Sequence, residues 1–264
     1  MQIIAERINS SRKAIAEAIS NKDSSFIRNE ARNQDEAGAD YIDVNAGTFT
    51  GKEVEALKWV IEAVQEATDK PLCIDSPDPA VIQAVIPVVK KTPMINSITL
   101  ETKRMEGILP IAAEYKAKII ALCQSERAMA ETTDEKLKIA GQLVKKVTAA
   151  GIPIDDLYID PLVYPLSTNT QSAVATLRAI NKIMVSFPGV HTICGLTNVS
   201  YGLPCRKLMN RTFLIAAVAN GLDSAILDPT DKQLYGALKA SLALVGKDQF
   251  CMDFIGAFRE GLLE

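Results

Sequence analysis

Amide and acid side chains follow the short apolar runs of this sequence, at the point where each run ends. All eight runs that have the composition of a buried strand show this feature. The set is Glu6, Arg7 and Asn9; Asp43 and Asn45; Asp75 and Ser76; Asn96 and Ser97; Gln124; Asp160; Thr197, Asn198 and Ser200; and Asp228. Such polar groups need hydrogen-bond partners when they are partly buried. Gathered in one place, they would hold a ligand with several N–H groups.

The balance of these side chains indicates which kind of ligand they would bind. Three or four carboxylates with few bases point away from a phosphate-rich ligand and toward a neutral heterocycle. A pterin ring has the complementary groups. Its amino group and ring N–H groups donate to carboxylates, while its carbonyl and bare ring nitrogens accept from amides.

The elements that must position these residues alternate along the chain. Short β-rich runs are separated by longer segments with helical periodicity, which is typical of repeated β-α units around a parallel sheet. The expected strands are Gln2–Ala5, Tyr41–Val44, Leu72–Ile74, Met94–Ile98, Ile119–Cys123, Leu157–Ile159, Thr192–Leu196 and Ser224–Leu227. The expected helices are Ser25–Ala37, Val54–Thr68, Ala80–Lys90, Lys103–Tyr115, Glu135–Ala149, Ser172–Ser186, Leu208–Ala219 and Lys232–Leu244.

About eight such units without a Gly-, Ser- or Pro-rich linker predict an α/β fold, a single (β/α)₈ TIM barrel domain over residues 1–264. An open doubly wound sheet is the alternative. The segment 54–64 places apolar residues on one stripe with Trp59 beside it, as the outer helix of a barrel requires. Gly38, Gly151 and Gly221 stand where helices should end with a positive φ. In a barrel the C-terminal strand ends carry the chemistry, so the polar side chains should converge there.

Composition excludes several classes of protein. The 29 basic and 32 acidic residues are interspersed, so no broad positive surface for nucleic acid is expected. A single histidine, His191, and five cysteines without a short pair spacing predict no bound metal. Neither a Gly-x-Gly-x-x-Gly run after a strand nor a triphosphate-binding loop occurs. The early charges, and the lack of an apolar run of about 20 residues, predict a cytoplasmic protein without a membrane segment.

Several of these residues also have a purely structural interpretation. Asp228 and Ser76 are equally explained as turn or cap residues. Glu6 and Arg7 are candidates for an ion pair across the barrel mouth. His191 stands at the start of its strand, on the face that serves stability. The cysteines, Tyr158 and Tyr164 are interpreted as packing residues.

The strand-end motifs taken together resemble those of a known family. They are Glu6-Arg7-Ile8-Asn9, Asp43-Val44-Asn45, Cys73-Ile74-Asp75-Ser76, Met94-Ile95-Asn96-Ser97, Tyr158-Ile159-Asp160-Pro161-Leu162, Gly195-Leu196-Thr197-Asn198-Val199-Ser200 and Asn210-Arg211-Thr212-Phe213. This set is similar to the pterin-binding barrels, and above all to the methyltetrahydrofolate:corrinoid protein methyltransferases. The similarity extends over nearly the whole chain.

The resemblance implies a homodimeric barrel that holds tetrahydrofolate or methyltetrahydrofolate at its C-terminal mouth, where a separate corrinoid protein docks. It implies that Asp75, Asn96 and Asp160 hold the pterin, that Asn198 reaches the reactive N5 atom as the catalytic residue, and that Arg206 lies near the p-aminobenzoylglutamate tail. We assign five further residues at the strand ends to the same folate site: Glu6, Asp43, Gln124, Gly195 and Thr197.

The implied reaction moves a methyl group between N5 of the folate and the cobalt of the corrinoid, and the sequence favours neither direction. Positioning is most of the task in such a displacement. A hydrogen bond from Asn198 to N5 would strengthen in the transition state, with the proton exchanged through solvent.

Two alternatives belong to other classes. One is an enzyme similar to dihydropteroate synthase, but its Lys after the seventh strand and its C-terminal Arg-x-His pattern do not occur here. The other is a non-catalytic folate-binding module.

Overall fold

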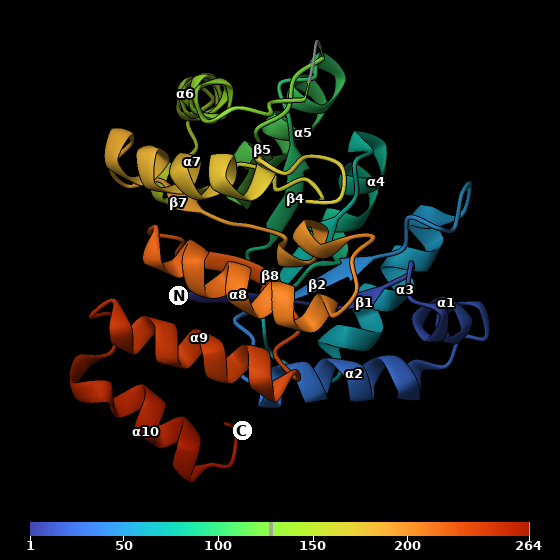
Figure 1. Ribbon diagram of the computed structural model, residues 1–264. Helices are drawn as coiled ribbons and strands as arrows, with labels where there is room; N and C mark the ends of the chain where they lie inside the picture. Colours follow the sequence, from blue (N-terminus) through green and yellow to red (C-terminus); the bar gives the residue numbers. More distant parts are fainter. Residues whose placement is uncertain (127–128, 264) are drawn as a thin grey trace.

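The computed structural model describes residues 1–126 and 129–263 and shows a barrel of eight parallel strands surrounded by helices (Figure 1). The strands are β1 (Gln2–Asn9), β2 (Tyr41–Asn45), β3 (Leu72–Asp75), β4 (Met94–Ile98), β5 (Lys118–Leu122), β6 (Leu157–Asp160), β7 (His191–Thr192) and β8 (Ser224–Leu227). The α-helices are α1 (Lys13–Ser20), α2 (Ser24–Glu36), α3 (Glu53–Gln65), α4 (Pro79–Val85), α5 (Thr102–Glu114), α6 (Thr133–Ala149), α7 (Ser172–Ser186), α8 (Arg206–Ala219), α9 (Lys232–Leu244) and α10 (Met252–Arg259). Short 3₁₀ helices are η1 (Ile86–Val88), η2 (Ile154–Asp156), η3 (Leu196–Ser200) and η4 (Gln249–Cys251).

The strand order β7-β6-β5-β4-β3-β2-β1-β8 confirms the barrel and excludes the doubly wound sheet. The seam lies between β8 and the segment that follows β7, where the backbone N–H of Ile226 donates to the oxygen of Cys194 at 3.1 Å. A single bridge between Gly195 and Ile226 accompanies this bond. The sequence predicted a strand over 192–196, which is wrong beyond Thr192, because the chain turns into η3 there.

The first β-α unit also differs from the prediction. Strand β1 continues to Asn9, with an irregularity between Ala5 and Ile8 where it pairs with β2. Glu6, Arg7 and Asn9 are therefore part of the strand, although they were expected after it. Two helices, α1 and α2, replace the one predicted here, and the Asp23 side chain caps the second by accepting from the N–H of Phe26.

The other predicted helices are present: α7 and α9 have the predicted ends, and the rest have shifted ends. Helix α4 stops at Val85 and continues as η1, and α8 begins two residues earlier than predicted, at Arg206. The C-terminal α10 was not predicted. Gly38, Gly151 and Gly221 have φ values of 91°, 84° and 105°, which confirms the turns predicted at these helix ends.

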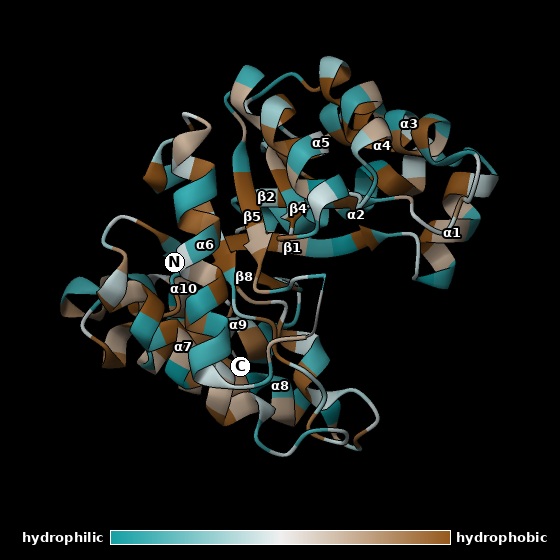
Figure 2. Ribbon diagram, turned by 90° about the horizontal axis from the view of Figure 1, so that it is seen from above, coloured by the Kyte–Doolittle hydropathy of each residue, from teal (hydrophilic) through white to brown (hydrophobic). Residues whose placement is uncertain are grey.

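The apolar core has two layers. Ile4, Met94, Ile120 and Tyr158 pack with their neighbours inside the barrel. The outer layer lies between strands and helices and includes the buried stripe of α3, with Trp59 packed against it as expected. Figure 2 shows β5 as almost entirely apolar and the helices as alternately hydrophilic and hydrophobic along their length. In residues 1–126 and 129–263, we find no helix with the length and apolar character that crossing a bilayer requires.

The N-terminal end of the barrel carries a polar cluster around the single histidine. The His191 ring stacks on Tyr158, with centroids 4.7 Å apart. Its Nδ1 lies 2.6 Å from Oδ2 of Asp223, and Nε2 lies 3.3 Å from Oδ1 of Asp155. These contacts join the β7 and β8 ends, and they confirm the structural interpretation of His191.

Candidate functional site

A cavity of about 690 Å³ lies at the C-terminal ends of the strands. Its volume is in the range of about 300–1,000 Å³ that is usual for small-molecule sites. The structure brings eight of the predicted residues together around it: Glu6, Asp43, Asp75, Asn96, Gly195, Thr197, Asn198 and Arg206. Side chains far apart in the sequence thus line one polar cavity.

Asp43 and Asp75 lie on the neighbouring strands β2 and β3. Asp43 is buried, and its Oδ1 has no hydrogen-bond partner in the part of the chain that the structure describes. The Asn45 amide holds Asp75 by donating to its Oδ2 at 3.0 Å. Burial and the neighbouring Asp75 raise the pKa of Asp43 well above its usual range, and burial raises the pKa of Asp75 to about 6. A ligand with N–H groups would supply the donors that these oxygens need.

Glu6 is the third acid of the cavity. Burial raises its pKa to about 7, and the charge of Asp228 adds to the shift, while Arg12 and Arg206 oppose it. Among the described residues, no ion pair joins Glu6 to its neighbour Arg7. Arg7 binds Glu30, with Nε at 2.7 Å from Oε2, and Asp228, with Nη1 at 2.9 Å from Oδ2.

The ion pair predicted between Glu6 and Arg7 is therefore wrong. Consecutive residues of a strand point to opposite faces, so one side chain enters the barrel and the other faces α2. The structural interpretations of Asp228 and Ser76 are confirmed. Asp228 accepts from the N–H and hydroxyl of Thr230, and the Ser76 hydroxyl accepts from the N–H of Asp78 at 3.3 Å.

Two predicted residues are not among those that line the cavity. Asp160 is buried at the end of β6, where its Oδ1 accepts from the N–H of Leu162 at 2.7 Å. Burial raises its pKa to about 6. Gln124 donates from its side chain to Glu101 at 3.1 Å and so links the segments after β4 and β5.

The segment after β7 presents Thr197 and Asn198 on η3, and Arg206 at the start of α8 is tied to it. The Arg206 guanidinium donates to the hydroxyl of Ser200 at 3.1 Å and to the backbone oxygen of Thr197 at 2.9 Å. It also lies over the Tyr201 ring, at 5.9 Å from the centroid. These contacts fix one cationic group at the rim of a cavity whose other ionisable groups include three acids.

Four polar residues that line the cavity were not predicted as site residues: Ser11, Arg12, Lys207 and Asn210. Lys207 is paired with Asp231 at 3.1 Å. Asn210 follows Arg206 by four residues, and residues at this spacing share a helix face. Asn210 belongs to the motif Asn210-Arg211-Thr212-Phe213, and its spacing from Arg206 would have placed it at the site once α8 was known to begin at Arg206.

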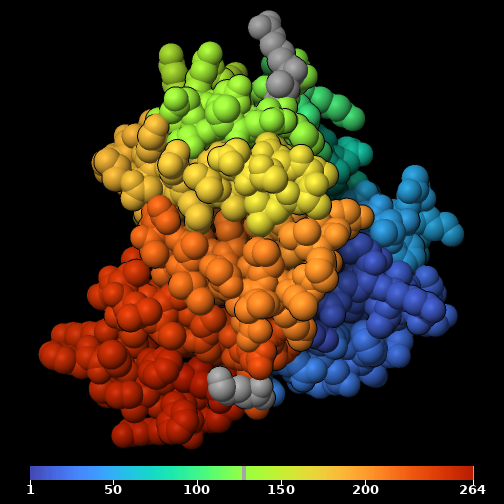
Figure 3. All heavy atoms as spheres, viewed as in Figure 1, coloured from blue at the N-terminus to red at the C-terminus, as the bar shows by residue number. Residues whose placement is uncertain are grey.

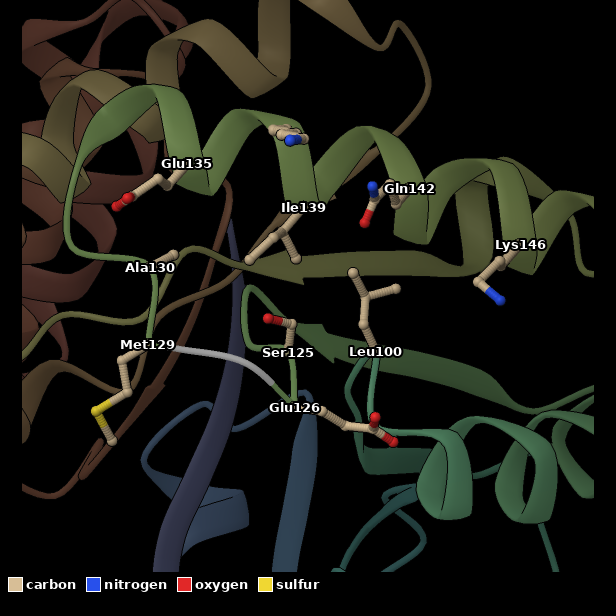
Figure 4. A pocket seen from close by; sticks show the side chains of 10 residues that line it. Leu100, Ser125, Glu126, Met129, Ala130, Glu135, Ile139, Gln142 and Lys146 are labelled. Carbon is tan, nitrogen blue, oxygen red and sulfur yellow. The ribbon is translucent and has the colours of Figure 1, made fainter.

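A second cavity, of about 450 Å³, lies beside α6 and shares no lining residue with the first. Leu100 and Ile139 point into it from its two sides (Figure 4). Its Glu135 accepts from the N–H groups of Glu131 and Thr132 and so caps α6. The acids and amides of the strand ends are absent from its lining. We therefore place the candidate site in the larger cavity.

Comparison with known proteins agrees with this geometry. Residues 5–228 match the family described as "Pterin binding enzyme". A methylcorrinoid:tetrahydrofolate methyltransferase of Eubacterium limosum is 39% identical over 99% of this chain and 97% of its own length. Methionine synthase of Mycobacterium tuberculosis is 28% identical over 85% of this chain, which matches 20% of that larger protein. Among solved structures, dihydropteroate synthase of Xanthomonas albilineans superposes with a TM-score of 0.72 at 18% identity, covering 94% of this chain and 93% of that one.

Proposed function

Because this chain belongs to the family of pterin-binding enzymes, we propose that it is a methyltransferase acting between a methylcorrinoid, carried by a separate protein, and N5 of tetrahydrofolate. The relative from Eubacterium limosum, which aligns from end to end, carries that activity in its name and gives the direction toward tetrahydrofolate. The structural observation behind the proposal is a pair of acids at the cavity, the half-buried Asp75 and the buried Asp43, whose Oδ1 has no partner among the described residues.

The pterin ring would lie against the ends of β2, β3 and β4. Asp43 and Asp75 would accept from its amino and ring N–H groups, and Asn96 would donate to a ring acceptor. Asp160 would complete this clamp at the end of β6, next to Gly195 of the cavity lining. We leave Gln124 out of the proposed site, since its amide is bound to Glu101 and it does not line the cavity.

Asn198 is the proposed catalytic residue. The corrinoid of the partner protein supplies the methyl group, and the chain described here has to present N5 to it in line with the bond that breaks. Asn198 lines the cavity from η3. Its amide would hydrogen-bond N5 and keep the lone pair directed at the methyl carbon, while the proton released from N5 passes to solvent. An amide serves this role at any pH near neutrality because it does not titrate there.

The corrinoid protein must approach the C-terminal mouth of the barrel, because N5 lies there in this proposal.

We also propose a homodimer in the cytoplasm. Large apolar side chains are exposed at the C-terminal end of the chain: Leu244 is 83%, Phe250 83% and Phe258 69% exposed. Figure 3 shows this part, in red, as a projecting edge of the molecule. Light scattering tests the proposed dimer. The unchanged protein should have the mass of a dimer, and Phe250→Lys should have the mass of a monomer.

The activity is tested by mixing the protein with methyltetrahydrofolate and a reduced corrinoid, and following the cobalt absorbance. The reverse mixture, methylcorrinoid with tetrahydrofolate, tests the named direction. We expect transfer in both mixtures, with Asp75→Asn much slower and the surface variant Lys145→Met unchanged. Folate binding without any spectral change would instead indicate a carrier module.

A further inference from the structure

Asn210 has a buried acceptor that the protein leaves without a partner. Its side-chain Oδ1 has less than 1 Å² of solvent-accessible surface and forms no hydrogen bond within residues 1–126 and 129–263. The residue lines the same cavity as Asn198 and Arg206. Buried polar groups are nearly always hydrogen-bonded, so an orphan acceptor at a cavity indicates that a bound ligand supplies the donor.

The position of Asn210 separates it from the acids that would hold the pterin. Helix α8 follows η3 and leads into β8, so it borders the β7–β8 side of the mouth. In an eight-stranded barrel with this strand order, β3 and β4 lie across from β7 and β8. Helix α8 and strands β2 and β4 accordingly fall in opposite halves of the view in Figure 2. The donor for Asn210 is thus on a part of the ligand that extends away from Asp43 and Asp75.

The order of residues along α8 indicates how that part of the ligand lies. The helix begins at the mouth with the exposed Arg206, and Asn210 is half-buried one turn further on. At 1.5 Å per residue, the separation of four positions corresponds to about 6 Å along the helix. The cavity lining therefore combines the acids of the strand ends with a neutral acceptor, Asn210, and a cation, Arg206, on α8. Arg12, on the segment after β1, adds a second guanidinium to the lining.

Folate has groups in the same order. Beyond the pterin come the secondary amine that joins it to the benzoyl ring, N10–H, and then the carboxylates of the glutamate. We propose that Asn210 accepts a hydrogen bond from N10–H and, with Arg206 and Arg12 at the glutamate carboxylates, makes the site select folates over bare pterins. This inference rests on the proposed function, because it takes the ligand to be a folate.

The test compares two ligands, methyltetrahydrofolate and 6-methyltetrahydropterin, which lacks the p-aminobenzoylglutamate. Calorimetric titration of Asn210→Leu should show at least about tenfold weaker binding of the folate and unchanged binding of the pterin. Asn210→Asp keeps an acceptor at this position and should retain most of the folate affinity. Thr212→Ala, an exposed change on the same helix, should alter neither affinity.

A variant of the pterin clamp provides the contrast. Asp75→Asn should weaken both ligands by a similar factor, because both contain the ring. The inference is overturned if Asn210→Leu binds both ligands as the unchanged protein does, or if it weakens both equally while its thermal unfolding stays the same. Failure of the proposed function gives another result in the unchanged protein: it would bind neither ligand, or it would bind folate without any change in the cobalt absorbance.

Discussion

The ammonium group of Lys136 lies 2.7 Å from the backbone oxygen of Leu162, in the segment that directly follows Asp160. The same group donates to the oxygen of Pro161 at 2.6 Å. Lys136 comes from α6 and is fully buried, and this burial lowers its pKa. Leu162 has a φ of 56°, and its N–H in turn donates to Asp160. One lysine thus fixes the backbone turn that positions the acid at the end of β6.

Replacing this lysine should loosen the turn. Lys136→Met keeps most of the side-chain volume but leaves two backbone oxygens without their donor, which we expect to cost about 2 kcal/mol of the free energy of unfolding. Folate affinity should also fall in Lys136→Met, because Asp160 loses its fixed orientation. Urea unfolding and calorimetric titration measure the two effects. Lys145→Met, an exposed change on the same helix, is the control, and equal behaviour of the two variants would contradict this role.

The role of Asn198 is best measured in a single turnover. Asn198→Ala at saturating folate should slow methyl transfer about 100-fold, because a hydrogen bond that strengthens in the transition state is lost. Folate affinity should change much less, since the acids of the clamp are intact. Stopped-flow absorbance of the corrinoid gives the rate. An unchanged rate would remove Asn198 from the mechanism.

Folate affinity should depend on pH through Asp75. Its pKa is about 6 because of burial, and a ring N–H donates a stronger hydrogen bond to the ionised form than to the protonated one. Binding therefore favours the carboxylate: affinity reaches its full value about one pH unit above the pKa and falls by up to about tenfold for each pH unit below it. Titrations between pH 5 and 8 should show this slope. In Asp75→Asn the dependence of folate affinity on pH should be weaker. Any dependence that remains comes from other titrating groups, including those of the ligand. The same slope in both proteins would rule out Asp75 as its source.

His191 should make stability depend on pH in the opposite sense. Its hydrogen bond with Asp223 raises the pKa of the imidazole above the usual 6.5. The charged pair therefore contributes its full stability below about pH 6.5, and the contribution is lost as pH rises through the raised pKa. The difference in unfolding free energy between the protein and His191→Gln should be larger at pH 6 than at pH 8.5. Glu6 also titrates here, but it is present in both proteins and cancels. A difference that does not change with pH would contradict the charged pair.

The barrel was predictable because local patterns specify it. The alternation of buried strands and amphipathic helices, with glycines at Gly38, Gly151 and Gly221, depends on neighbours in the sequence. The predictions failed where a distant contact decided the outcome. Strand β7 ends at Thr192 because the chain turns into η3 beside β8. Arg7 forms its ion pairs with Glu30 and Asp228 and not with Glu6.

The same division applies to the site. By its residue types at the strand ends, the sequence determined that acids and amides would meet at one mouth of the barrel and that they suit a pterin. Only the tertiary structure decided which of them line the cavity, that Gln124 does not, and that Arg12 and Asn210 do. The physical reason is that residue type and periodicity are local properties. The direction of a side chain into a shared cavity depends on the packing of strands and helices that are far apart in the chain.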